Sequence, residues 1–147
     1  MGQMSGLVDG PIDPAPLLAA VADPSCGAVV LFLGAVRDRH EGRAVTGIRY
    51  DAHRAMAEAR LAALLAEVGA ECGARLAAVH RLGEVAVGEV SVAIAAAAPR
   101  RGAAYAASRR ALERLKRELP VWKLERYADG SSAWREEERL LPAGGAP

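Results

Sequence analysis

Two lysines flank a proline near the C-terminal end of the sequence, in the stretch RLKRELPVWKLE that covers residues 114–125. Lys116 and Lys123 stand on either side of Pro120. Because proline ends a helix, we expect the chain to turn there and to bring the second lysine back toward the first. Two cations crowded into a partly buried place make a lysine easier to deprotonate, so that it can act as an acid or a base. The alternative interpretation is that both are ordinary solvated surface lysines.

Three arginines stand where one expected element passes into the next. Arg37 follows a strongly apolar segment, and Arg100 and Arg101 precede a predicted helix. The N–H groups at a helix N-terminus favour an anion, and guanidinium groups bind phosphate through paired hydrogen bonds. We therefore predict a site for a small anionic substrate, bound by Arg37, Arg100, Arg101 and Lys116, at which Lys116 and Lys123 do the chemistry.

The periodicity of apolar residues predicts the elements that must position these cations. The apolar run GAVVLFLGAV over 27–36 is typical of a strand buried on both faces. On the strand after Pro120, Trp122 alternates with Lys123 and is expected to anchor that strand in the core. Helices are predicted over residues 13–23, 53–71 and 101–119, and strands over residues 27–36, 45–51, 74–83, 89–98, 121–127 and, as a hairpin partner, 133–138.

This order of elements favours an α+β fold with a largely antiparallel sheet, because several strand pairs are joined by short turns. The 147 residues suit a single domain, 1–147, with one core. Residues 1–13 and 138–147 carry glycine and proline and are predicted to be flexible.

Composition excludes several classes of function. A net charge of +1 and 4% aromatic residues give no basis for nucleic-acid binding. His40, His53 and His80 are far apart in the sequence, so no metal site is expected. No segment is predicted to span a membrane or to act as a secretion signal, and no cofactor motif occurs. Cys26 and Cys72 form no metal-ligand or disulfide pattern, which predicts reduced thiols and a cytoplasmic protein.

Several separated blocks resemble one known family, and they occur in that family's order. The blocks are GAVVLFLGAVRDRHEGRAVTGIRYDAH, HRLGEVAVGEVSVAI, LKRELPVWKLE and the DGSSAW hairpin, which together extend from about residue 27 to residue 134. They resemble the large, catalytic subunit of molybdopterin synthase. The pattern LKxxxPxWKxE is the most specific of these blocks.

The resemblance implies a fold, an activity and partners. The fold is an α/β-hammerhead-type domain with an added subdomain. The activity is a sulfur transfer to cyclic pyranopterin monophosphate, which forms molybdopterin during molybdenum cofactor biosynthesis. The sulfur donor is the thiocarboxylate at the C-terminal Gly-Gly of a small ubiquitin-like partner subunit. The assembly is a homodimer of large subunits within a heterotetramer, and the reaction needs no cofactor.

The resemblance also assigns roles to the cations. The family's functional lysines match Lys116 and Lys123, and its strand-end arginine matches Arg37. A His-Arg pair of the family's anion pocket falls on Arg100 and Arg101, so arginine replaces the histidine. Arginine binds a phosphate but stays protonated, so it does not shuttle protons. Glu125 is expected either to orient a lysine or to form a surface ion pair of little value.

Two other functions remain open on the sequence. The chain can be a catalytically impaired relative that keeps the partner surface as a scaffold, which Arg100 would favour. It can also be a small regulatory domain that binds an anionic nucleotide through Arg100 and Arg101.

Overall fold

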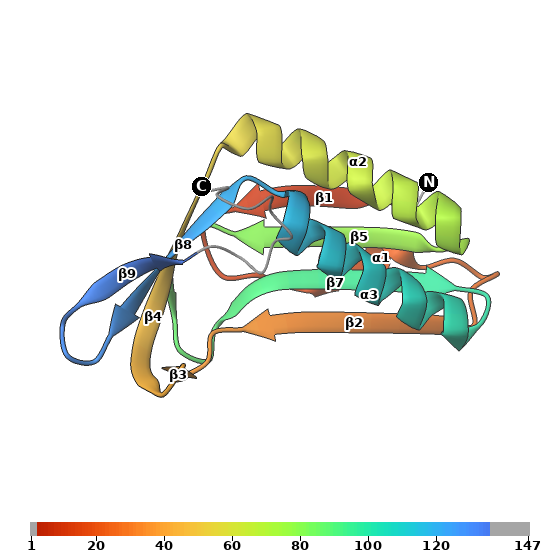
Figure 1. The fold of residues 1–147 in the computed structure, drawn as a ribbon. Helices are drawn as coiled ribbons and strands as arrows, with labels where there is room; N and C mark the ends of the chain where they lie inside the picture. Colours follow the sequence, from red (N-terminus) through yellow and green to blue (C-terminus); the bar gives the residue numbers. More distant parts are fainter. Residues whose placement is uncertain (1–2, 136–147) are drawn as a thin grey trace.

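A four-stranded sheet carries three helices on its two faces, and a second, five-stranded sheet extends from one end of it (Figure 1). The computed structural model describes residues 3–135 of the chain. The first sheet has the order β1-β5-β7-β2, in which β1 pairs with β5 in parallel and the other pairs are antiparallel. Its strands are β1 (Met4–Val8), β5 (Arg75–Arg81), β7 (Val90–Ala98) and β2 (Ala28–Ala35).

The second sheet has the order β3-β4-β8-β9, and β6 also pairs with β4. The strands are β3 (Arg39–His40), β4 (Arg43–Ala52), β8 (Val121–Tyr127), β9 (Ser132–Arg135) and β6 (Gly83–Ala86). This second sheet, together with the first sheet and its helices, gives the predicted α+β fold with largely antiparallel strands.

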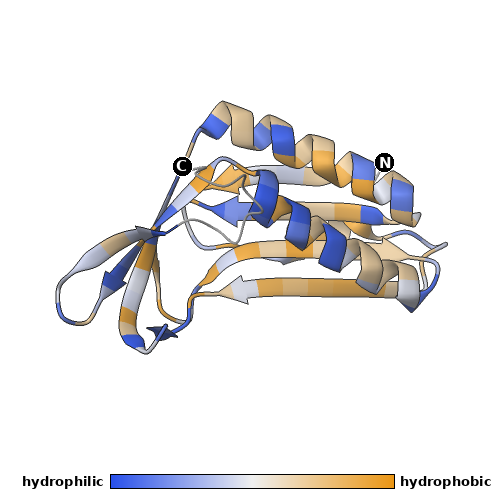
Figure 2. Cartoon of the chain, in the orientation of Figure 1, coloured by the Kyte–Doolittle hydropathy of each residue, from blue (hydrophilic) through white to orange (hydrophobic). Residues whose placement is uncertain are grey.

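Alternation along β7 explains how both faces of the first sheet are buried. Val92, Ile94 and Ala96 pack in the main core beneath α2 (Arg54–Cys72) and α3 (Arg101–Glu118). The alternate alanines of β7 pack in a second cluster with Leu17 and Val21 of α1 (Ala15–Val21) on the opposite face. Small side chains let a helix approach a sheet closely, and Figure 2 shows the apolar residues that run along β7 and β2.

Local signals set the ends of the two long helices. The imidazole Nδ1 of His53 accepts a hydrogen bond from the N–H of Met56 and caps α2, and Gly73 ends it with φ of +64°. Helix α3 ends at Glu118, because Leu119 is already extended and Pro120 follows it. The chain therefore enters β8 directly after the helix, as the sequence predicts.

Three details of the predicted fold are wrong. The flexible lead-in predicted for residues 1–13 contains β1, which pairs with β5 from Met4 to Val8. The run over residues 27–36 forms β2, but this strand lies at the sheet edge and alternates between half-buried and exposed residues. Trp122 is half-buried and belongs to neither core cluster, because the core-facing side of β8 carries Val121 and Tyr127 instead. The predicted flexible segment 138–147 lies outside the described residues.

Candidate functional site

A cavity of about 140 Å³ opens where the C-terminal part of α3 meets the two sheets. Arg37 reaches it from the end of β2, Lys116 from α3 and Lys123 from β8. We call this site the cationic cavity. Its other lining residues are Phe32, Gly34, Ala35, Val36, Arg39, His40, Val45, Ile48, Tyr50, His80, Ser91, Val92, Leu112, Leu115 and Glu125.

The turn at Pro120 brings the two lysines to one place. Lys116 lies one turn of helix before Pro120, while Lys123 lies opposite Tyr50 in the pairing of β4 with β8. The carbonyl of Pro120 accepts a hydrogen bond from the N–H of His53 at 3.1 Å, which ties the turn to the start of α2. Both lysines are half-buried. The predicted meeting of Lys116, Lys123 and Arg37 is therefore present in a single chain.

A buried carboxylate stands among these cations. Glu125 is 2% exposed, and one of its oxygens accepts a hydrogen bond from the Tyr127 hydroxyl at 2.9 Å. The Nε of Arg135 lies 3.4 Å from the same oxygen. The other oxygen lies 3.4 Å from Nδ1 of His40. Glu125 is thus part of a buried network and not the exposed surface pair that was one alternative.

Tyr127 connects this network to the end of the second sheet. Its hydroxyl accepts hydrogen bonds from the guanidinium group of Arg135, with the shorter at 3.0 Å. The guanidinium carbon of Arg43 lies 3.6 Å from the centre of its ring, a cation–π contact. Partners from β3, β8 and β9 therefore hold the carboxylate of Glu125 in one position.

His80 and Tyr50 form part of the cavity wall. His80 is 4% exposed, and its Nδ1 lies 2.8 Å from the carbonyl oxygen of Arg81. Because a carbonyl only accepts, Nδ1 carries the proton. The rings of His80 and Tyr50 meet edge to face, with centroids 4.9 Å apart. This arrangement agrees with the structural role of a buried, hydrogen-bonded histidine.

Arg100 and Arg101 do not reach the cationic cavity of their own chain. They line a separate open surface pocket with Gly27 and Pro99, at the N-terminal end of α3. With a rise of 1.5 Å per residue, Arg101 lies about 22 Å along the helix from Lys116. Both arginines are exposed. Within one chain, the structure therefore brings Arg37, Lys116 and Lys123 together but places Arg100 and Arg101 apart from them.

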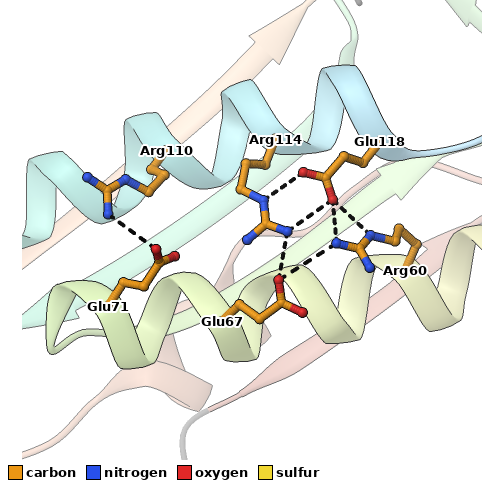
Figure 3. Close-up of polar contacts among 6 residues, drawn as sticks. All are labelled: Arg60, Glu67, Glu71, Arg110, Arg114 and Glu118. Carbon is orange, nitrogen blue, oxygen red and sulfur yellow. Dashed lines mark hydrogen bonds and ion pairs between the residues drawn. The ribbon is translucent and has the colours of Figure 1, made fainter.

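Ion pairs between α2 and α3 hold the helix that carries Lys116 (Figure 3). Arg114 donates to Glu118 at 2.7 Å and to Glu67 of α2 at 2.7 Å, and Arg60 of α2 donates to Glu118 at 2.8 Å. The hydrogen bond from Arg114, assisted by Arg60, lowers the pKa of Glu118 from 4.5 to about 2. The same carboxylates raise the pKa of Arg114. The network fixes the last turns of α3 against α2.

Sequence reasoning did not assign His40 or Arg39 to the site. Both belong to the polar segment between the strands predicted over residues 27–36 and 45–51, yet they form β3, which pairs with β4 beside the cavity. No periodic signal marks a strand of two residues. The proximity of His40 to Glu125 depends on the pairing of β4 with β8, which the sequence alone does not specify.

The described residues offer neither a metal cluster nor a membrane-spanning helix. Within residues 3–135, no group of three or more histidine, cysteine or acidic side chains is placed to share a metal ion. Likewise, no helix in this part of the chain combines the length and the apolar character that a membrane span requires.

The fold and the site define a small α+β protein with a cavity that gathers cations around a buried carboxylate. Comparison with known proteins then identifies the family. The family model described as "MoaE protein" matches residues 7–118, and the chain belongs to this family.

Named relatives agree with this assignment. The chain is 44% identical over 133 residues to the molybdopterin synthase catalytic subunit of Oryza sativa subsp. indica, which covers 90% of this chain and 68% of that protein. The crystal structure of molybdopterin synthase from Staphylococcus aureus superposes with a TM-score of 0.84 at 34% identity, covering 88% of this chain and 95% of that one. A complex of subunits 1 and 2 of molybdopterin-converting factor from Helicobacter pylori has a TM-score of 0.69 at 21% identity, with 95% of each chain covered. This last likeness establishes the fold alone.

Proposed function

We propose that this chain is the catalytic subunit of a molybdopterin synthase. In this role it transfers sulfur from the C-terminal thiocarboxylate of a small ubiquitin-like partner to cyclic pyranopterin monophosphate, in molybdenum cofactor biosynthesis. The observation that carries the proposal is the meeting of Arg37, Lys116 and Lys123 at one cavity. Their positive charges suit a substrate that carries a phosphate and a donor that carries a thiocarboxylate.

Each cation has a distinct role in this proposal. Lys123 stabilises the negative charge that develops on the acyl oxygen when the thiocarboxylate reacts, because an ammonium group held in a low-dielectric site acts strongly on such charge. Lys116 positions the pterin or moves a proton, and Arg37 binds its phosphate. Glu125 lies two residues from Lys123 on the same face of β8 and orients the polar groups around it.

A second copy of the chain supplies Arg100 and Arg101 in this proposal. The cavity of one chain, at about 140 Å³, is smaller than the roughly 300–1,000 Å³ of pockets that bury a drug-sized ligand, so a substrate of that size extends beyond it. Strand β2 runs beside α3, from the arginine end near Pro99 to the cavity end at Arg37.

The exposed face of β2 is suited to this pairing. Val29, Leu31 and Leu33 are 52%, 36% and 43% exposed on an edge strand, and together we call them the β2 stripe. A dimer with its two-fold axis near the middle of the stripe would bring Arg100 and Arg101 of one copy beside Arg37 of the other. A dimer of this kind, with a small subunit at each cavity, is the heterotetramer that we propose.

The proposed compartment is the cytoplasm. Cys26 and Cys72 are both free thiols, as expected of a protein in a reducing environment.

The test uses purified chain, thiocarboxylated partner and pyranopterin substrate in a single turnover. Lys123→Ala should lower conversion by at least about 100-fold, because a lost donor to a developing oxyanion costs about that much. Arg117→Ala is the control, because Arg117 is an exposed neighbour of Lys116 outside the cavity and its loss should leave the rate unchanged. Circular dichroism checks that both variants fold.

Two results would overturn the proposal. Turnover of Lys123→Ala at the parent rate would remove Lys123 from the chemistry. A parent chain that binds the partner but yields no product would instead identify the scaffold function.

A further inference from the structure

His40 occupies a position in the cationic cavity that suits proton transfer. It lines the cavity from β3, and its side chain is 25% exposed, so a ligand in the cavity can reach it. The neighbouring arginines stay protonated at neutral pH and cannot exchange a proton. His80 also lines the cavity but is 4% exposed and holds the Arg81 carbonyl through Nδ1. His40 is therefore the more accessible imidazole.

One ring nitrogen of His40 faces a buried side chain, and the other faces an exposed side chain. Nδ1 lies 3.4 Å from the buried carboxylate of Glu125, which is itself fixed by Tyr127. Nε2 lies 3.4 Å from Glu41, whose side chain is 69% exposed and whose other oxygen lies 3.8 Å from the guanidinium group of Arg135. A buried carboxylate at Nδ1 holds an imidazole in one orientation, which leaves Nε2 to take up and return a proton.

The proposed sulfur transfer contains a step that needs such a group. The sulfur begins bonded to the acyl carbon of the partner's last glycine and ends as a thiol on the product. The acyl carbon–sulfur bond must therefore break, and an oxygen atom from water must replace the sulfur. A general base that takes the water proton accelerates such a step by about 100-fold to 10,000-fold.

We propose that His40 is the general base and acid for this acyl release, and that Glu125 is its positioning residue. This inference rests on the function proposed above. The partner's last glycine and the substrate are joined at this stage through the transferred sulfur, as a thioester. His40 Nε2 removes a proton from water as the water oxygen bonds to the acyl carbon of this thioester. The carbon–sulfur bond breaks, its electron pair goes to the sulfur, and the imidazolium returns the proton to that sulfur. One water is consumed, and one carboxylic acid and one thiol are formed, with no oxidation or reduction.

The test follows a single turnover of the full chain with thiocarboxylated partner and pyranopterin substrate, by mass spectrometry of the partner. His40→Gln should form the covalent adduct between partner and substrate at the parent rate and release it about 100-fold more slowly, so that the adduct accumulates. His40→Ala should show the same defect, and added imidazole should restore release. The matched control is Glu41→Gln, which changes the exposed neighbour of the same imidazole and should release product at least as fast as the parent.

Each other result has a definite meaning. Release by His40→Gln at the parent rate, without adduct, overturns the role of His40 while the proposed function stands. A His40→Gln chain that folds by circular dichroism but forms no adduct also overturns it, because the defect then precedes acyl release. A parent chain that forms neither adduct nor product contradicts the proposed function itself.

Discussion

Glu125 places a negative charge inside a site that is otherwise cationic. Its carboxylate is 2% exposed and lies close to His40, Tyr127 and Arg135. A buried charge is tolerated when partners surround it, and removal of one member leaves the others unpaired. Glu125 therefore contributes to the stability of the fold and also orients the side chains around the cavity.

Two replacements of Glu125 should separate the effect of losing its charge from the effect of losing its hydrogen-bond acceptor. Glu125→Ala should lower the free energy of unfolding by about 3–5 kcal/mol, because the Arg135 charge and the Tyr127 hydroxyl lose their buried partner. Glu125→Gln keeps an acceptor for Tyr127 and should cost only about 1–2 kcal/mol. Urea unfolding at neutral pH measures both values.

The control for Glu125 is a carboxylate of the same five-stranded sheet that is exposed to water. Glu84 pairs with Arg126 at 2.8 Å but is 55% exposed, so Glu84→Gln should cost less than about 1 kcal/mol. Equal losses at positions 84 and 125 would contradict the argument from burial.

At the scale of elements, helix α3 sets the position of Lys116, and helix α2 holds α3 in place. Glu118 accepts hydrogen bonds from Arg114 of its own helix and from Arg60 of α2. Its side chain is 26% exposed, so the pairs are partly shielded from water. The depressed pKa of Glu118, about 2, indicates that the folded state favours the ionised form.

Glu118→Gln should lower the free energy of unfolding by about 1–2 kcal/mol at pH 7, since a charged hydrogen-bond network is lost. Because the folded pKa lies below the ordinary value of 4.5, this contribution is present above pH 4.5 and is lost as the pH falls toward 2. Thermal melting of parent and variant between pH 7 and pH 3 should therefore show a gap that narrows in acid. Glu113→Gln, which removes the exposed pair with Arg109, should show a gap below about 0.5 kcal/mol at every pH.

The elements with strong periodicity were predictable, and those defined by tertiary pairing were not. The apolar faces of α2 and α3 and the stop at Pro120 follow from local sequence, as does the meeting of Lys116 with Lys123. The segment 4–8 carries no alternating pattern and becomes β1 only through its pairing with β5. The run that forms β2 is apolar at successive positions, but the sequence cannot say whether its own chain covers both faces.

At the scale of the whole molecule, the two groups of cations stand at opposite ends of α3. The helix length, about 22 Å between Arg101 and Lys116, prevents a single chain from uniting them. Sequence resemblance assigns both groups to one site but does not say how many chains build it. The number of chains matters because Arg100 and Arg101 line a pocket that is separate from the cationic cavity.

Mixed assemblies test whether the site is shared between two copies. Lys123→Ala and the double variant Arg100→Ala, Arg101→Ala should each be inactive alone. When the two chains are unfolded together and refolded, random pairing gives half mixed dimers with one intact site each, so about a quarter of the parent activity should return. Activity that stays absent after refolding, with mixed dimers present by native mass spectrometry, would contradict a shared site.

The β2 stripe has a consequence for how the reaction rate depends on protein concentration. If arginines from one copy complete the cavity of another, the catalytic unit exists only while two chains remain associated. Progressive dilution should then reduce turnover per chain before any loss of helix or sheet signal, and an excess of inactive chains that keep Arg100 and Arg101 should restore it.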